Sequence, residues 1–227
     1  MNVSDLAAEL ARHGLILRGG FAFGVGEAAP LAADGRAARA VALVGHGGGS
    51  IWPHFSQWLA GCKQVPTDPL DRWSKEVLEA VASRFAARAV FPSDKPYMPF
   101  QSWAMRAEGL KSSPLGILMH PQFGLWHAYR GALLFDREIA LEAPEASPHL
   151  CDLCDGKDCM KACPADAVSK AGLDIGRCRV HLASPAGAGC VNGGCAARAA
   201  CPHDGYRYGA EQLAFHMAAY LNSIAAS

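Results

Sequence analysis

The placement of the cysteines constrains this chain more than any other feature of its sequence. Eight of the nine cysteines follow residue 150, and they fall into two groups of four that each end in a Cys-Pro step. Thiolates are soft ligands that select iron–sulfur clusters, zinc or Cu(I). The sequence therefore predicts two four-thiolate sites, whose members are Cys151, Cys154, Cys159 and Cys163 in the first group and Cys178, Cys190, Cys195 and Cys201 in the second.

The first group is a Cx2Cx4Cx3CP run that resembles the motif of bacterial ferredoxins, although four residues stand between its second and third cysteines where two are usual. In two-cluster ferredoxins the cysteine of the Cys-Pro step ligates the other cluster. The resemblance therefore implies two 4Fe-4S clusters with shared ligands. One would bind Cys151, Cys154, Cys159 and Cys201, and the other Cys163, Cys178, Cys190 and Cys195.

Disulfides, structural zinc and ordinary buried thiols are the alternatives to clusters. Disulfides need an oxidising compartment, but residues 2–5 have neither the basic start nor the apolar core of a signal peptide, which predicts a cytoplasmic protein with reduced thiols. Zinc is the strongest alternative, although it gives no reason for two Cys-Pro steps. Cys62 stands alone and is expected to be a core residue.

The composition divides the chain into two domains. All five tryptophans precede residue 130, and the polar segment 142–148 contains two prolines, so we expect domains at 1–145 and 146–227. With 51% hydrophobic residues the chain can form a globular core. The 21 basic and 21 acidic residues balance, which gives no reason to expect nucleic acid, and no apolar stretch is long enough to span a membrane.

The first domain is predicted to be an α+β sheet domain. Its apolar runs predict strands at residues 15–25, 40–44, 88–91, 115–119 and 128–135, with a loop at 45–50. Helical periodicity predicts helices after Ser4 and after Asp68-Pro69. In the second domain we expect a short helical turn at 165–170 and a final helix at 211–222 that packs back on a domain.

Two segments of the first domain resemble the cobalamin-processing CblC proteins. They are HPQFGLWHAYRG at residues 120–131 and TDPLD at 67–71. Joined to a two-cluster module, the layout also resembles epoxyqueuosine reductase. The resemblance implies a nitroreductase-like or flavin-reductase-like sheet domain whose pocket holds cobalamin or FMN near His120, Phe123, Trp126 and Arg130. The alternative is a tight hairpin with a core tryptophan and a surface arginine.

Together these features favour an iron–sulfur oxidoreductase, in which two 4Fe-4S clusters pass electrons to a flavin or corrinoid held by the N-terminal domain. Its partner would be a redox protein or a small-molecule electron acceptor. Two alternatives stay open: a ferredoxin-like carrier whose first domain only docks, and a zinc-stabilised interaction protein. The sequence predicts neither the catalytic residues nor the terminal substrate nor the oligomeric state. His46 lies in a glycine-rich stretch without the Lys-Ser/Thr of a P-loop, so a connecting loop is expected there.

Overall fold

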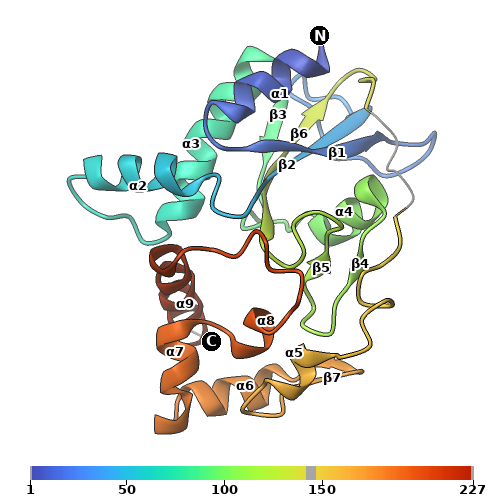
Figure 1. The fold of residues 1–227 in the computed structure, drawn as a ribbon. Helices are drawn as coiled ribbons and strands as arrows, with labels where there is room; N and C mark the ends of the chain where they lie inside the picture. Colours follow the sequence, from blue (N-terminus) through green and yellow to red (C-terminus); the bar gives the residue numbers. More distant parts are fainter. Residues whose placement is uncertain (1, 142–146, 226–227) are drawn as a thin grey trace. The chain divides into compact units, whose positions relative to one another are not determined.

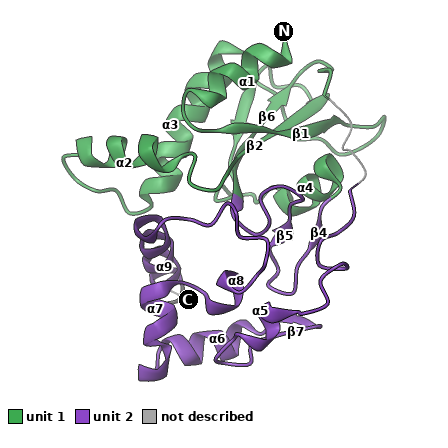
Figure 2. Ribbon diagram, viewed as in Figure 1, with its two compact units in different colours: residues 1–109, 128–146 green, residues 110–127, 147–227 purple. Residues whose placement is uncertain are grey.

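The computed structural model describes residues 2–141 and 147–225 of the chain. It divides into two compact units (Figure 2): unit 1 comprises residues 1–109 and 128–146, and unit 2 comprises residues 110–127 and 147–227. The domain boundary predicted at residue 145 lies outside the described residues. Residues 110–127, which we expected in the first domain, belong to unit 2.

Unit 1 contains a four-stranded sheet in the order β1-β2-β6-β3 (Figure 1). The strands are β1 (Ile16–Ala22), β2 (Ala40–Gly47), β3 (Arg88–Val90) and β6 (His127–Phe135), and the first residue of β6 is counted with unit 2. β1 pairs with β2 and β3 with β6, both antiparallel. Every residue of β2 is buried, as expected for a strand covered on both faces.

The register of β1 shifts between Leu17 and Gly20, where two glycines allow an irregular backbone. Gly19 has a φ of +66°, and a Cβ on Gly20 would lie 2.1 Å from the carbonyl oxygen of Val41. Only glycine fits both demands without displacing the neighbouring strand. The register shift at these residues is therefore a bulge within one continuous strand.

Four helices accompany this sheet: α1 (Val3–Ala11), α2 (Trp52–Gly61), α3 (Pro69–Arg84) and α4 (Phe100–Glu108). α1 packs on β1 and on α3, α3 packs on β3, and α4 packs on β1 and β2. The predicted cap Ser4 lies inside α1, because Asn2 caps that helix through a bond to the Ser4 amide. α3 begins after Asp68 as predicted, although the Asp68 side chain makes no capping hydrogen bond.

The loop predicted at residues 45–50 is wrong in its first half, because β2 continues to Gly47. His46 lies in the strand, fully buried, with its Nδ1 3.1 Å from the carbonyl oxygen of Gly48. The three glycines that follow suggested a flexible connection from the sequence. Packing of the buried strand overrides that local preference.

Unit 2 consists of short elements joined by loops. It contains the two-stranded pairs β4 (Lys111–Ser112) with β5 (Leu118–Met119) and β7 (Val168–Ser169) with β8 (Gly172–Leu173). The predicted helical turn at 165–170 is wrong, since β7 lies there. The helices are α5 (Asp158–Lys161), α6 (Ile175–Leu182), the 3-10 turn η1 (Pro185–Gly187), α7 (Ala188–Gly193), α8 (Ala196–Ala199) and α9 (Ala210–Ala225).

Among the described residues, no helix combines the length and the apolar character needed to cross a membrane.

Candidate metal-cluster sites

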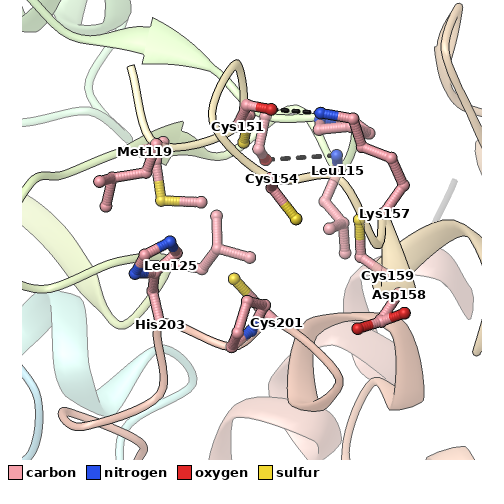
Figure 3. A pocket seen from close by; sticks show the side chains of 14 residues that line it. Leu115, Met119, Leu125, Cys151, Cys154, Lys157, Asp158, Cys159, Cys201 and His203 are labelled. Atoms are coloured by element: carbon pink, nitrogen blue, oxygen red, sulfur yellow. Dashed lines mark hydrogen bonds between the residues drawn. The ribbon is translucent and has the colours of Figure 1, made fainter. Parts of the chain in front are cut away.

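Four thiols of unit 2 line one small cavity (Figure 3), here called the first cavity. Three come from the loop around α5, and the fourth follows α8. Its apolar wall is made by Leu115, Met119 and Leu125, which belong to the same hydrophobic cluster as Cys201. This packing explains why residues 110–127 belong to unit 2. The four thiols are those of Cys151, Cys154, Cys159 and Cys201.

The other four thiols line a second cavity of about 340 Å³ within unit 2. Cys163 follows α5, Cys178 lies in α6, Cys190 lies in α7, and Cys195 directly precedes α8. The Pro164 step after Cys163 carries the chain out of the first cavity and toward this one. The two groups of four are the groups that the ferredoxin resemblance implied, and ligation itself stays a prediction.

Electrostatic interactions between the thiols follow the same division. Cys151 interacts with Cys154, Cys159 and Cys201, and burial together with this neighbouring negative charge raises the pKa of Cys151 to about 11. Burial also raises the pKa of Cys159 and of Cys201, and in each case Cys154 contributes to the shift. Close thiolates repel one another, so burial and this repulsion disfavour the ionised form of Cys151, Cys159 and Cys201, whereas a bound cation would favour it.

Thiols of the second cavity show pKa shifts in the same direction. Burial raises the pKa of Cys195, and Cys190 and Cys163 reinforce the shift. Burial likewise raises the pKa of Cys178, with contributions from Cys195, Cys163 and Cys190. Four mutually interacting thiols in each cavity are a donor set suited to soft, multiply charged metal centres.

Backbone amides already point at several of these sulfur atoms. The Ala167 amide donates to the Cys163 sulfur at 3.4 Å. The Met160 amide bonds to the sulfur of Cys159, and the His203 amide to that of Cys201. Such bonds stabilise negative charge on sulfur and are one of the means by which proteins set the potential of a cluster.

The first cavity also has a cation beside its thiols. Lys157 adopts a left-handed backbone conformation, with a φ of +49°, and its ammonium donates to the carbonyl oxygen of Cys151. Its charge acts on the Cys151 and Cys159 thiols and favours their ionised form. Lys157 is one of the four residues between Cys154 and Cys159, where ferredoxins usually have two, so this longer loop carries a charge at the site.

No three His, Cys, Asp or Glu side chains in residues 2–141 and 147–225 are close enough to hold a single metal ion. A 4Fe-4S cube does not require that closeness, because each thiolate binds a different iron atom.

The four residues predicted to line a flavin or corrinoid pocket have different surroundings. His120 stacks on Phe123, with ring centroids 4.4 Å apart, and its Nδ1 accepts hydrogen bonds from the amides of Gln122 and Phe123. Trp126 is 1% exposed and lines the second cavity. All three lie in unit 2.

Arg130 belongs to unit 1. Its Nε donates to Ser74 Oγ at 2.9 Å, and its guanidinium forms an ion pair with Asp71, which the sequence had linked to the same resemblance. The side chain of Arg130 is 14% exposed, so this arginine is part of the packed interior of unit 1 rather than a surface residue.

No motif in the sequence pointed to Arg198, which contacts several of these parts of unit 2. Its guanidinium carbon lies 4.2 Å from the ring centroid of Trp126, and its Nη2 donates to the carbonyl oxygen of Leu125 at 2.6 Å. A cation over the face of a buried indole is a favourable interaction. Arg198 thereby fixes α8, which separates Cys195 from Cys201, to the segment that walls both cavities.

Helix α9 contributes a further wall of the second cavity. Leu213, Met217 and Tyr220 line it, and these are residues of the helical face that the sequence predicted to pack back on a domain. The predicted range 211–222 agrees with the observed helix, Ala210–Ala225.

Comparison with known proteins gave no match to a protein family and none among curated proteins. Two solved structures resemble the chain in fold. Epoxyqueuosine reductase from Streptococcus thermophilus is 13% identical over 74% of this chain and 50% of that one, with a TM-score of 0.45. The enzyme from Bacillus subtilis, with its catalytic loop swung out of the active site, is 13% identical over 90% and 66%, with a TM-score of 0.49.

The chain thus spans half the length of the first of these enzymes. Similarity at this level carries no argument about function, which rests on the thiol geometry.

Proposed function

We propose that this protein is an iron–sulfur oxidoreductase that binds two 4Fe-4S clusters in unit 2. One would be held by Cys151, Cys154, Cys159 and Cys201, and the other by Cys163, Cys178, Cys190 and Cys195. The observation that carries the proposal is the division of eight thiols into two sets of four around two cavities. Each set takes one member from the Cys-Pro step of the other sequence group. Four mutually interacting thiols meet the ligand requirement of one cube.

Bound clusters of this kind take up and release single electrons. The residues of the chain would supply the thiolates, direct backbone amides at sulfur and exclude water with Leu115, Met119 and Leu125. Water exclusion and hydrogen bonds to sulfur together set the potential. A redox protein or a small molecule would exchange the electrons.

The first test is the metal content of protein prepared without oxygen. We expect about eight iron and eight inorganic sulfide per chain, the content of two 4Fe-4S clusters. Replacing Cys62, which lies apart in unit 1 and donates to the Trp58 carbonyl oxygen, by serine is the control and should change neither number. Zinc at one or two equivalents without sulfide would overturn the proposal and favour a zinc-stabilised protein.

The second test separates the clusters by paramagnetic resonance. Cys159→Ser and Cys201→Ser should remove or alter one and the same signal, although Cys159 lies in α5 and Cys201 follows α8. Cys163→Ser and Cys195→Ser should affect the other signal. If Cys159→Ser and Cys163→Ser affected one signal together, the crossed sharing would be wrong even with an unchanged iron count.

We further propose that unit 1 holds the electron acceptor, a flavin or a corrinoid. The support is the sequence resemblance of residues 120–131, of which residues 128–131, with Arg130, lie in unit 1. Arg130 would have to exchange Asp71 for an anionic group of the cofactor. The affinity should then fall by roughly 1.5–3 kcal/mol in Arg130→Ala, the value of a charge-assisted hydrogen bond.

Calorimetric titration with FMN and with cobalamins measures this affinity. Arg72→Ala is the matched control, because Arg72 lies on the same helix as Asp71 but forms an exposed pair with Glu76. Saturable binding of neither compound would leave a ferredoxin-like carrier as the function.

A further inference from the structure

The two cavities differ in the groups that approach their sulfur atoms. In the first cavity the Met160 and His203 amides bond to sulfur, and the Lys157 ammonium lies nearby. In the second cavity, amides bond to Cys195 and a side-chain hydroxyl bonds to Cys178. That hydroxyl belongs to Tyr220, which lies on α9, the last helix of the chain.

Tyr220 and Cys178 both line the second cavity, and they reach it from different helices. Cys178 lies in the middle of α6, while Tyr220 is in the third turn of α9. α9 is held in position by packing against α7, the helix that carries Cys190. The contact is therefore part of the wall of the cavity, beside Leu213 and Met217 on the same helix.

The direction of this hydrogen bond follows from the chemistry of the two groups. A metal-bound thiolate has no proton and can only accept, while a tyrosine hydroxyl carries a proton that it can donate. With a cluster bound, the Tyr220 O–H would thus donate to the Cys178 sulfur. This bond stabilises negative charge on the cluster and favours the state with one more electron.

We propose that Tyr220 is a positioning residue of α9 that raises the reduction potential of the second cluster through a hydrogen bond to Cys178. This inference rests on the proposed function, since it requires a cluster in the second cavity. It gives the C-terminal helix a role in electron transfer beyond closing the cavity. The first cluster, which has Lys157 in place of such a hydroxyl, is independent of α9.

The test is a potentiometric titration of Tyr220→Phe, followed by paramagnetic resonance of both clusters. The substitution keeps the ring and removes one oxygen, so iron and sulfide should stay at the wild-type content. The cluster whose signal is altered by Cys178→Ser should become harder to reduce. Loss of one hydrogen bond should change its reduction equilibrium by about threefold to tenfold, where tenfold corresponds to 59 mV for a one-electron couple.

Two control variants distinguish this effect from general disturbance. Tyr206→Phe removes a hydroxyl that accepts from the Gln122 side chain at 2.8 Å and does not line the second cavity, so both potentials should stay unchanged. Leu221→Met alters the packing of α9 at a residue that does not line the second cavity, and should also leave the potentials unchanged.

Exchange into D2O gives an independent signature. Pulsed resonance on the second cluster should detect one coupled exchangeable deuteron fewer in Tyr220→Phe than in wild-type protein and in Tyr206→Phe. Unchanged potentials and couplings in Tyr220→Phe, with both clusters present, would overturn this inference and leave the proposed function intact. An equal shift of both clusters would overturn it as well, because the bond reaches only one of them. Wild-type protein without iron and sulfide would instead overturn the proposed function.

Discussion

The interiors of the two units of this protein are built differently. Unit 1 has a continuous apolar interior, in which all eight residues of β2 are buried and Phe55, Leu78 and Leu133 have no exposed surface. In unit 2 a small cluster of buried apolar residues has thiols packed against it, and two cavities are lined by four thiols each. Unit 1 is stabilised by burial of apolar surface, whereas we expect the stability of unit 2 to depend on what its thiols bind.

The helices next to the first cavity show the same contrast with unit 1. α3 spans 16 residues with an apolar face, but α5 and α8 span only four residues each. Such short helices do not persist on their own, because forming the first turn costs more than it returns. Cross-links between Cys159 of α5 and Cys201 after α8, made through a common cluster, would supply the missing stabilisation.

Removal of iron is expected to have the largest effect. Since metal bound only by the folded chain contributes its binding energy to folding, apo-protein should lose protection in residues 147–205 while unit 1 keeps it. Hydrogen exchange of apo and holo protein, measured segment by segment, checks this. Equal protection in the two forms would show that unit 2 has a sufficient core without metal and would remove the contrast between the units.

A cavity made in the core of unit 1 should destabilise unit 1 and leave the iron content of unit 2 unchanged. Phe55 contacts the rings of Trp52, Trp58 and Trp73, and its replacement by alanine should cost about 3–5 kcal/mol. Denaturant unfolding followed by tryptophan fluorescence measures the loss, because these three tryptophans surround the site. Iron content should remain at the wild-type value in native conditions, and its loss would mean that the units fold as one.

Substitution of Gly124 should destabilise the protein less, and its effect should be confined to unit 2. It has a φ of +58°, and an added Cβ would lie 2.3 Å from the carbonyl oxygen of His203, which is close to Cys201. Gly124→Ala should therefore destabilise unit 2 by roughly 2–3 kcal/mol, through backbone strain and this clash.

Gly116→Ala is the matched control for that variant. Gly116 has a φ of +76°, but nothing lies within 4 Å of an added Cβ, so only the strain of about 1 kcal/mol remains. Cluster retention on mild heating should fall more in Gly124→Ala than in Gly116→Ala. Equal retention would indicate that contact between Gly124 and His203 does not support the first cavity.

The sequence predicted those features that depend on the local pattern of apolar residues or on the chemistry of thiol ligands. The two Cys-Pro steps marked the ends of both groups of thiols, and the pattern of apolar residues predicted α3, β6 and α9. It did not predict that residues 110–127 belong to unit 2, because that follows from contacts of Leu125 and Trp126 with residues some 70 positions later, such as Arg198. The role of Arg198 and the bond between Tyr220 and Cys178 depend on tertiary packing in the same way, and no motif marks them.

The smallest expected effect concerns the ion pair between Asp71 and Arg130 in unit 1. The Asp71 side chain is 40% exposed, so water screens the pair, and Asp71→Asn should cost only about 0.2–1 kcal/mol. A double-mutant cycle with Arg130→Ala, measured by denaturant unfolding, gives the coupling energy directly. A weak coupling means that Arg130 can exchange Asp71 for an anionic ligand at little cost, as the proposed acceptor site in unit 1 requires. A coupling well above 1 kcal/mol would make the pair a fixed part of the core and would count against Arg130 as a ligand-binding residue.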